Sequence, residues 1–311
     1  MLRIRIKHID GTETELTRYL TVVLNSDIEV PADDLTVTCP FDKCLSDNAD
    51  FIYLYNDDTL IFCGQIDEII NIKRKSGVIT KLVSRSMAGA LLDNEAEPIT
   101  YIYPAAEFIF DRHLKPFGIE SYEADETPFY GNLRIDKGMT HWQVFENFCK
   151  NRFGTLPRIT GNGKALFKGY QDMEVVVFGE ESFNYYFIKE NNKRCELITE
   201  VRLKLDEFGA YNGKIKNENK ACNGITRVRY VNATADTSTI ETADKMIARS
   251  NADSYNIELK CVGCCVSLIG RKAKINDALL GKKENLVVSK VKYVLDDSGE
   301  KSTVTLRKEK F

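Results

Sequence analysis

Neighbouring acidic side chains are the first candidates for chemistry in this chain of 311 residues. They form the pairs Asp33-Asp34, Asp57-Asp58, Glu180-Glu181 and Asp296-Asp297. A glycoside hydrolase needs two carboxyl groups that face each other across a cleft, and burial must raise the pKa of one of them. All four pairs fall at predicted turns or strand ends, where solvent would keep both carboxylates ionised. We therefore predict no catalytic residue among them.

Cysteine and histidine offer the next chemistry, as metal ligands or nucleophiles. The segment Cys261-Val262-Gly263-Cys264-Cys265 contains the only CxxC among nine cysteines. A zinc site would need a second pair or nearby histidines, and His8, His113 and His141 are far away in sequence. An odd number of cysteines also fits free thiols better than a disulfide framework. We predict a structural role for the CxxC, no metal site and no cofactor.

A glycine-rich turn and a run of basic residues complete the candidates. Gly161-Asn162-Gly163-Lys164 lacks the earlier glycine of a phosphate-binding loop, because Arg158 stands there, and Ala165 replaces its Ser or Thr. The basic run comprises Arg271, Lys272, Lys274, Lys282, Lys283, Lys290 and Lys292. It holds few aromatic residues that could stack on bases, and the pI of about 5.8 argues against a nucleic-acid footprint. We predict a turn and a solvated or subunit-facing surface.

The net charge of −3 conceals an asymmetry along the chain. Residues 1–97 hold 10 basic and 17 acidic side chains, a net of −7, whereas residues 173–311 hold 24 and 20, a net of +4. Solvated faces explain this asymmetry, and so do subunits that meet head to tail through unlike surfaces. No apolar run approaches the roughly 18 residues of a membrane span, and the N-terminus lacks a signal peptide, so we expect a protein made in the cytoplasm.

The elements that must position these residues divide the chain into three ranges. Residues 1–97 alternate apolar and polar side chains as β-strands do, with a hairpin turn at 56–58 and a short helical turn at 87–92. Residues 98–172 form a small α/β middle domain. Its first helix begins at Pro104 and runs to about Leu114, and its second follows a capping box of Thr140 and Gln143 and stops at Gly154.

Residues 173–311 are β again, except for one helix. That helix is predicted from Ser238 to about Ala252, with Ser238 and Glu241 as its capping box. A closing hairpin joins residues 286–295 to 302–306. The fold class is therefore α+β, mainly β: two tube-like β-barrel or sandwich domains that flank a small α/β middle domain.

Three segments carry a resemblance to a known family. They are Val30–Thr38, Ile61–Glu68 and Val83–Glu95, the last of which includes Ser84-Arg85-Ser86 and Leu91-Leu92-Asp93-Asn94-Glu95. In these segments the chain resembles the baseplate hub proteins of contractile phage tails and related particles, the late-control-D or XkdQ-like tail proteins. The middle helices and the closing hairpin are similar to that family in their order.

The resemblance implies a structural protein without enzymatic activity. It implies a homotrimer in which each chain supplies two tube-like domains, so that a hexameric tail tube can sit on a trimeric central spike. The implied partners are further copies of the chain, the tail tube protein, the central spike protein and other baseplate proteins. A barrel completed by its neighbours would also remove exposed strand edges.

The same resemblance implies synthesis in a bacterial host cytoplasm, followed by assembly into the tail or baseplate of a phage, a headless bacteriocin-like particle or another contractile injection system. No membrane anchor is expected. DNA would pass through the lumen without specific binding, and we hypothesise that the acidic first range helps it to slide by repelling its backbone.

Strand position alone selects the residues of a subunit or tube interface. They are Arg3, Arg5, Ile66, Glu68, Arg85, Val288, Lys290 and Lys292. Two other functions stay open: a tail-associated cell-wall hydrolase, and a non-catalytic carbohydrate-binding module. The second would need exposed aromatic platforms, whereas the single tryptophan, Trp142, is predicted to lie buried on a helix.

Overall fold

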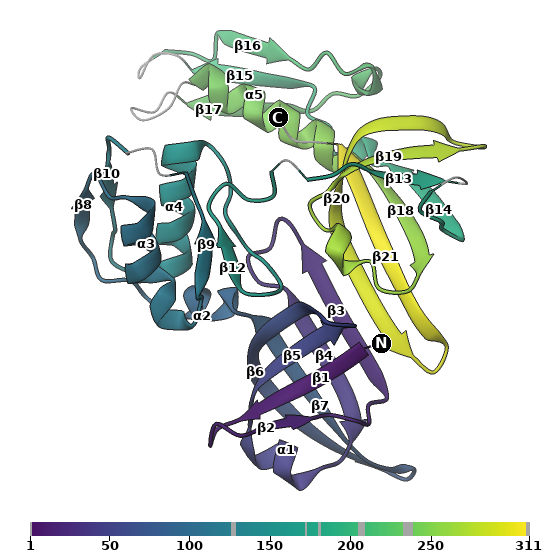
Figure 1. Cartoon of the computed structure of the whole chain (residues 1–311). Coiled ribbons are helices and arrows are strands. Elements are labelled where there is room, and N and C mark those ends of the chain that lie inside the picture. The colour runs from purple at the N-terminus through teal and green to yellow at the C-terminus, as the bar shows by residue number, and fades with distance from the viewer. Residues whose placement is uncertain are drawn as a thin grey trace. The chain divides into compact units, whose positions relative to one another are not determined.

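Figure 1 shows the computed structural model, which describes residues 2–125, 129–171, 173–179, 182–204, 209–232 and 239–308. Strands outnumber helices, and the α+β, mainly β fold class is confirmed. The chain divides into two compact units, each described by itself. Unit 1 comprises Met1–Glu174, Cys261–Arg271 and Ser289–Thr303, and unit 2 comprises Val175–Lys260, Lys272–Val288 and Val304–Phe311. The ranges 1–97, 98–172 and 173–311 stay a prediction.

Unit 1 begins with an antiparallel sheet in the order β3-β4-β7-β6-β5-β1-β2. Its strands and one short helix are β1 (Leu2–His8), β2 (Glu13–Glu15), β3 (Thr21–Asp27), β4 (Asp34–Pro40), α1 (Lys43–Asn48), β5 (Ala49–Asn56), β6 (Thr59–Arg74) and β7 (Gly77–Ser86). Buried and half-buried residues alternate along β1, β3 and β4. This alternation is the predicted one, because a strand with one face in the core exposes every second side chain.

The end of the chain joins this sheet. The closing hairpin consists of β20 (Gly281–Asp296) and β21 (Gly299–Lys308), as the sequence predicts. β20 pairs antiparallel with β3, with Lys290 opposite Asp27 and Leu295 opposite Val22. The edge of β3 is therefore covered by a strand of the same chain and needs no neighbouring subunit.

Helices and short strands make up the middle of unit 1. They are α2 (Ala88–Asp93), β8 (Thr100–Ile102), α3 (Ala106–His113), η1 (Lys115–Phe117), β9 (Ser121–Glu123), β10 (Asn132–Arg134), α4 (His141–Phe153), β11 (Arg158–Ile159), β12 (Lys164–Leu166) and, later in the chain, η4 (Val266–Leu268). The Thr140–Gln143 capping box is present, and Gly154 ends α4 with a φ of 68°. Buried Trp142, Phe145 and Phe148 on α4 belong to the core of this region. The prediction that Pro104 starts a helix is wrong, because the N-cap of α3 is Ala105.

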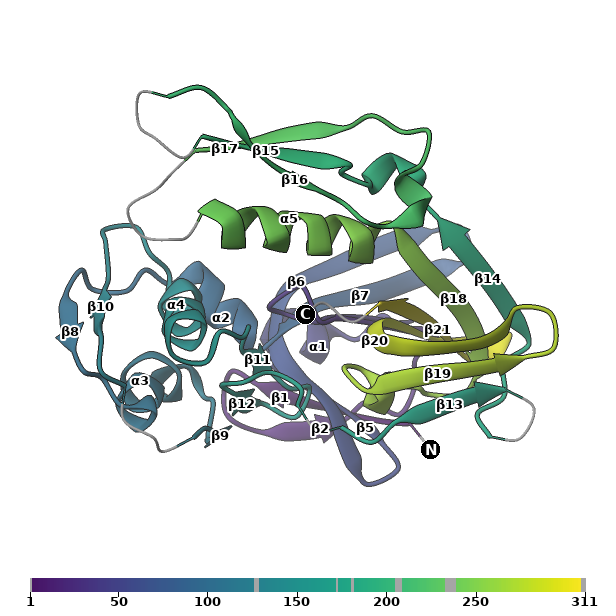
Figure 2. The ribbon, with the colours of Figure 1, turned by 90° about the horizontal axis from the view of Figure 1, so that it is seen from above.

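Unit 2 combines β-strands with one long helix (Figure 2). Its elements are β13 (Val176–Gly179), β14 (Phe187–Asn192), η2 (Arg194–Glu196), β15 (Glu200–Lys204), β16 (Gly213–Lys216), η3 (Lys220–Cys222), β17 (Val228–Asn232), α5 (Thr239–Asp253), β18 (Tyr255–Val262) and β19 (Lys272–Asp277). β15, β16 and β17 form a separate three-stranded sheet. The predicted helix is present as α5, while its expected cap residue, Ser238, lies outside the described residues. In the described ranges, no helix combines the length and apolar character that a membrane crossing requires.

Candidate functional site

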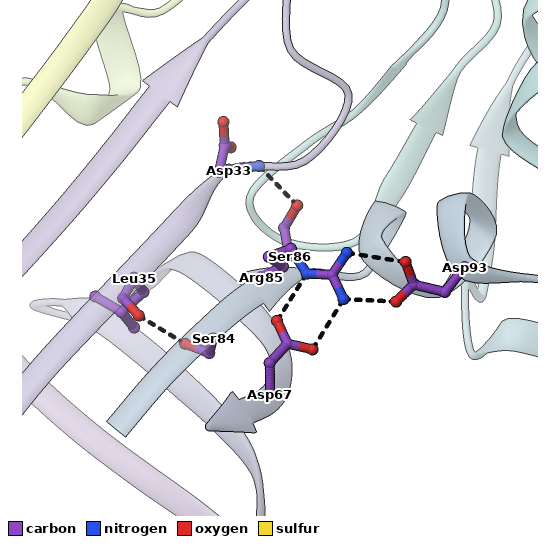
Figure 3. A network of polar contacts seen from close by, with 7 residues as sticks. All are labelled: Asp33, Leu35, Asp67, Ser84, Arg85, Ser86 and Asp93. Carbon is purple, nitrogen blue, oxygen red and sulfur yellow. Dashed lines mark hydrogen bonds and ion pairs between the residues drawn. The ribbon is translucent and has the colours of Figure 1, made fainter. Parts of the chain in front are cut away.

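A guanidinium held by two carboxylates lies where the first sheet of unit 1 meets its middle region. Arg85, near the end of β7, donates to Asp67 on β6 through Nε at 2.7 Å and Nη2 at 3.0 Å. It donates to Asp93 on α2 through Nη1 at 3.1 Å and Nη2 at 2.5 Å. Figure 3 shows the planar guanidinium between the two carboxylates. The hydrogen bonds that Arg85 donates to Asp67 and Asp93 raise the pKa of Arg85 above its usual value, so this side chain ties two strands to a helix as a permanent cation.

The two serines beside Arg85 are structural. Ser84 Oγ donates to the Leu35 carbonyl at 3.0 Å, and Ser86 Oγ accepts from the Asp33 N–H at 3.0 Å (Figure 3). Both serines are buried. With each hydroxyl bonded to the backbone of the β4 segment and no histidine among those partners, neither side chain is arranged as a nucleophile.

A cavity of about 410 Å³ opens beside this network. Its lining includes Phe51, Gln65, Met87 and Phe117 together with Arg85 and Asp93. The Arg85 guanidinium lowers the pKa of Asp93, through hydrogen bonds first and charge second. A glycosidase acid requires the opposite shift. Asp93 is therefore not the protonated carboxyl group on which such hydrolysis would depend.

A second acidic–arginine pair in unit 1 is buried, which corrects the prediction that all acidic pairs are solvated. Asp33 is only 4% exposed and forms an ion pair with Arg158, which is 2% exposed. Burial raises the pKa of Asp33, and the Arg158 guanidinium opposes that rise. Burial alone would lower the pKa of Arg158, but Asp33 and Tyr170 raise it. Asp34 and the pair Asp57-Asp58 are exposed as expected, and Glu180-Glu181 lies outside the described residues.

Arg158 also holds the chain segment before Asp33. Its Nη1 donates to the Asp27 carbonyl at 2.8 Å and to the Val30 carbonyl, and its Nη2 donates to Ser26 Oγ at 3.3 Å. Sequence reasoning treated Arg158 only as a residue that excludes a phosphate loop. No alternation of buried and exposed residues marks it, because Pro157, Arg158 and Ile159 are buried in succession.

The turn at Gly161-Asn162-Gly163 is present and forms a third joint. The Cys63 N–H donates to the Gly161 carbonyl at 2.8 Å. A Cβ atom on Gly161 would lie 2.0 Å from the Ile61 carbonyl oxygen, so only glycine allows this approach to β6. Arg85, Arg158 and Gly161 thus fix the middle region to the first sheet by three different contacts.

The predicted interface residues fall into separate groups on the strands. Arg3 and Arg5 lie on β1 with their guanidinium carbons 5.0 and 5.6 Å from the centroid of the Tyr55 ring. Ile66 and Glu68 lie on β6, opposite Ser84 and Val83 of β7, and therefore close to Arg85 in the same sheet. All of these belong to unit 1.

The remaining interface candidates lie on β20. Lys290 forms an ion pair with Asp27 at 2.6 Å, and Lys292 is exposed opposite Asn25. Val288 is fully buried, so its side chain offers no surface to a partner. Elsewhere in the basic run, Lys283 pairs with Glu190 at 3.0 Å. Carboxylates that already neutralise these lysines favour the solvated-surface interpretation over nucleic-acid binding.

The described part of the chain contains no cluster of three or more His, Cys, Asp or Glu side chains that could hold a metal ion. Cys261 and Cys265 are buried and Cys264 is partly buried, all as free thiols. The structure does unite two histidines that are distant in sequence: His113 and His141 share a hydrogen bond between their Nδ1 atoms at 2.9 Å. Tyr101 Oη bonds His113 Nε2 at 3.1 Å. Burial lowers the pKa of His113 to about 4.

No family model matches this sequence, and no curated protein does. The structure, in contrast, matches solved tail proteins along its whole length. It is similar to the 43 kDa tail protein of prophage MuSo2 from Shewanella oneidensis, with a TM-score of 0.76 and 15% identity over 99% of this chain and 98% of the other. It is also similar to the tail protein from Neisseria meningitidis MC58, with a TM-score of 0.73 and 16% identity over 99% and 97%.

The chain has a phage tail protein fold. A third structure with this fold is the E. coli c3393 protein, described as a component of the type VI secretion system with structural similarity to T4 bacteriophage tail proteins gp27 and gp5. Its TM-score is 0.55 at 6% identity, over 99% of this chain and 77% of the other. Such low identities establish the tail protein fold and leave the role within a tail to be proposed.

Proposed function

We propose that this protein is a structural baseplate hub of a contractile tail, a trimeric adaptor that joins the hexameric tail tube to the trimeric central spike. The observation that carries the proposal is the fold match to a prophage tail protein over 99% of this chain and 98% of that one. The likeness to a secretion-system component that is described as similar to the T4 tail proteins gp27 and gp5 supports a role in a tail-like assembly. The place at the tube-to-spike junction comes from the family resemblance of the sequence. The tail tube, the spike and other baseplate proteins are then its partners.

Free strand edges support an assembly of several copies. β2 pairs only with β1 among the described strands, and its three residues are all exposed. In unit 2, β14 pairs only with β18 among those strands. Unpaired edges are sites where another chain can add. β2 is short and carries Glu13 and Glu15, which restricts such addition to a matching partner.

The same geometry disfavours the rival hydrolase. Asp93 in the cavity has a lowered pKa. Asp33, a carboxyl group whose pKa burial raises, is buried in an ion pair with Arg158. We therefore propose a protein without enzymatic activity. A zymogram on peptidoglycan should show no clearing. Clearing that persists after contaminating enzymes are removed would contradict the hub proposal and support the hydrolase.

The hub proposal is tested by mass and symmetry. Purified chain, alone and with its spike and tube proteins, is examined by sedimentation and negative-stain imaging. We expect a species of three times 35.3 kDa that forms threefold rings. A protein that stays monomeric with both partners present, and that is missing from purified tail particles, would refute the role.

A further inference from the structure

The three-stranded sheet of unit 2 has two unlike faces. Val201 and Leu203 on β15 point to one face, where they pack with Ala243 of α5. Figure 2 shows α5 along that face of the sheet. Because side chains alternate along a strand, Glu200, Arg202 and Lys204 belong to the other face. In the described part of unit 2, no helix packs on that second face (Figure 2).

The strand register fixes which residues share the uncovered face. Arg202 lies opposite Lys214 of β16 and opposite Tyr230 of β17. Glu200 lies opposite Lys216, and Lys204 lies opposite Asn232. Cross-strand partners project to the same side of a sheet. The basic face is therefore defined as Arg202, Lys204, Lys214 and Lys216 with Glu200, Val228, Tyr230 and Asn232.

Charge on the basic face is unbalanced. Glu200 is the one carboxylate among its members, and it is shared by Arg202 at 2.9 Å and Lys214 at 3.6 Å. Lys204 and Lys216 have no ion pair among the described residues. Four cations and one carboxylate give this face a net positive charge. Protein surfaces more often intersperse charges of both signs.

Two aromatic rings stand on this face. Tyr230 is 57% exposed, and the Tyr211 ring packs edge to face against the Tyr230 ring, with ring centroids 4.9 Å apart at 78°. The Tyr211 hydroxyl donates to Asn232 Oδ1, which holds the ring in place. Exposed tyrosine beside arginine is the composition that dominates binding energy in protein interfaces.

We infer that the basic face binds the acidic first range, residues 1–97, of a second copy of this chain. The argument is charge complementarity, since that range carries a formal net charge of −7 while the basic face is positive. Cations from outside the range pair with three of its carboxylates, Asp27, Asp33 and Glu97, and the remainder still leaves the range acidic. Opposite fields speed encounter and fix orientation between subunits. A contact between unlike surfaces is head to tail, and such contacts close into rings when the rotation permits. The inference rests on the proposed hub and names one surface through which its copies meet.

Sedimentation of the full chain at about 50 mM and 500 mM salt tests the contact, because screening weakens exposed charge pairs. We expect the association constant between copies to fall as the salt concentration rises. In Lys214→Glu/Lys216→Glu it should fall at least tenfold. The matched control is Lys193→Glu/Lys220→Glu, which makes the same charge change on exposed residues of unit 2 that lie outside the basic face and outside strand β14. It should associate like the unaltered chain. Tyr230→Ala should give an intermediate loss.

Carbodiimide, which joins amines to carboxylates in direct contact, identifies the partner surface. A mixture of isotope-labelled and unlabelled chains should give links between Lys214 or Lys216 and acidic residues of 1–97 in another copy. Any one of three results would overturn the inference. The chain could stay monomeric at low salt, the crosslinks could involve only ranges other than 1–97, or the double variant could associate as strongly as the unaltered chain. Oligo(dT) binding that the double variant abolishes without any change in self-association would also overturn it.

These outcomes separate the face from the hub. Trimers that form equally well in Lys214→Glu/Lys216→Glu would remove the basic face and leave the hub proposal standing. Absence of the protein from tail particles would remove the hub, whatever the purified chain does. A confirmed contact would also give the acidic first range a second explanation besides a DNA-repelling lumen.

Discussion

Two arginine–aspartate sites join the same two regions of unit 1, and they differ in burial. The Arg158 side chain is 3% exposed and that of Asp33 is 5%. At the other site the side chains of Arg85, Asp67 and Asp93 are 36%, 30% and 54% exposed. Arg85 makes more charged hydrogen bonds than Arg158, yet water surrounds them. The comparison teaches that the number of ion pairs is a poor guide to their weight, because removing one buried partner strands the other charge away from water.

The largest effect on the free energy of unfolding is expected at the buried pair of Arg158 and Asp33. Arg158→Met leaves the Asp33 carboxyl group buried without its cation, and we expect a loss of about 3–5 kcal/mol in the free energy of unfolding. Urea denaturation measures it. The control is Lys164→Met, which removes an exposed ion pair with Glu123 at 2.7 Å in the same region and should cost less than about 1 kcal/mol. Equal losses in the two variants would show that burial does not decide.

The next largest effect on the free energy of unfolding is expected from His113, which is buried without an opposite charge beside it among the described residues. Because the pKa of His113 falls to about 4 in the folded chain, the unfolded state takes up the proton first as the pH falls. Stability is therefore complete above about pH 6.5 and declines between about pH 6.5 and 4, by up to about 3 kcal/mol. Unfolding measured across this window should show the slope, and His113→Phe should flatten it. An unchanged slope in that variant would assign it to other groups.

The contact between Gly161 and β6 also joins the middle region to the first sheet, and it sharpens the comparison because it involves no charge. Gly161→Ala forces a methyl group against the Ile61 carbonyl, and we expect a loss of about 2 kcal/mol. Thermal unfolding provides the measurement. Asn162→Ala, in the same turn, is the control and should cost less than about 1 kcal/mol. If Gly161→Ala unfolds like the unaltered chain, the turn is free to move away from β6.

The smallest effect is expected at the exposed site. Arg85→Met removes every contact to Asp67 and Asp93, but water can solvate both carboxylates, so the loss should be below about 1 kcal/mol. The same variant should lose the salt dependence that screening gives to exposed pairs. A loss as large as that of Arg158→Met would reverse the comparison.

Local patterns were sufficient for the elements themselves. The alternation at residues 2–8, the capping box of Thr140 and Gln143, and the turns at 57 and 161–163 depend on neighbours along the chain, and each was predicted. The start of α3 was missed by two residues, since proline fits the segment before a helix as well as its first turn. The residues altered to test assembly, Lys214, Lys216 and Tyr230, could not be chosen from sequence periodicity alone.

The sequence by itself thus determined a mainly β chain, the capped helix α4 and a strong charge asymmetry. Tertiary structure alone decided that Asp33 meets Arg158 across 125 residues, that His113 meets His141 across 28, and that β20 covers the edge of β3. It also decided that Val288 is core and that four cations share one face of the sheet in unit 2. The physical reason is that hydrogen bonding within an element is set by adjacent residues, whereas burial and charge pairing depend on which distant elements pack together.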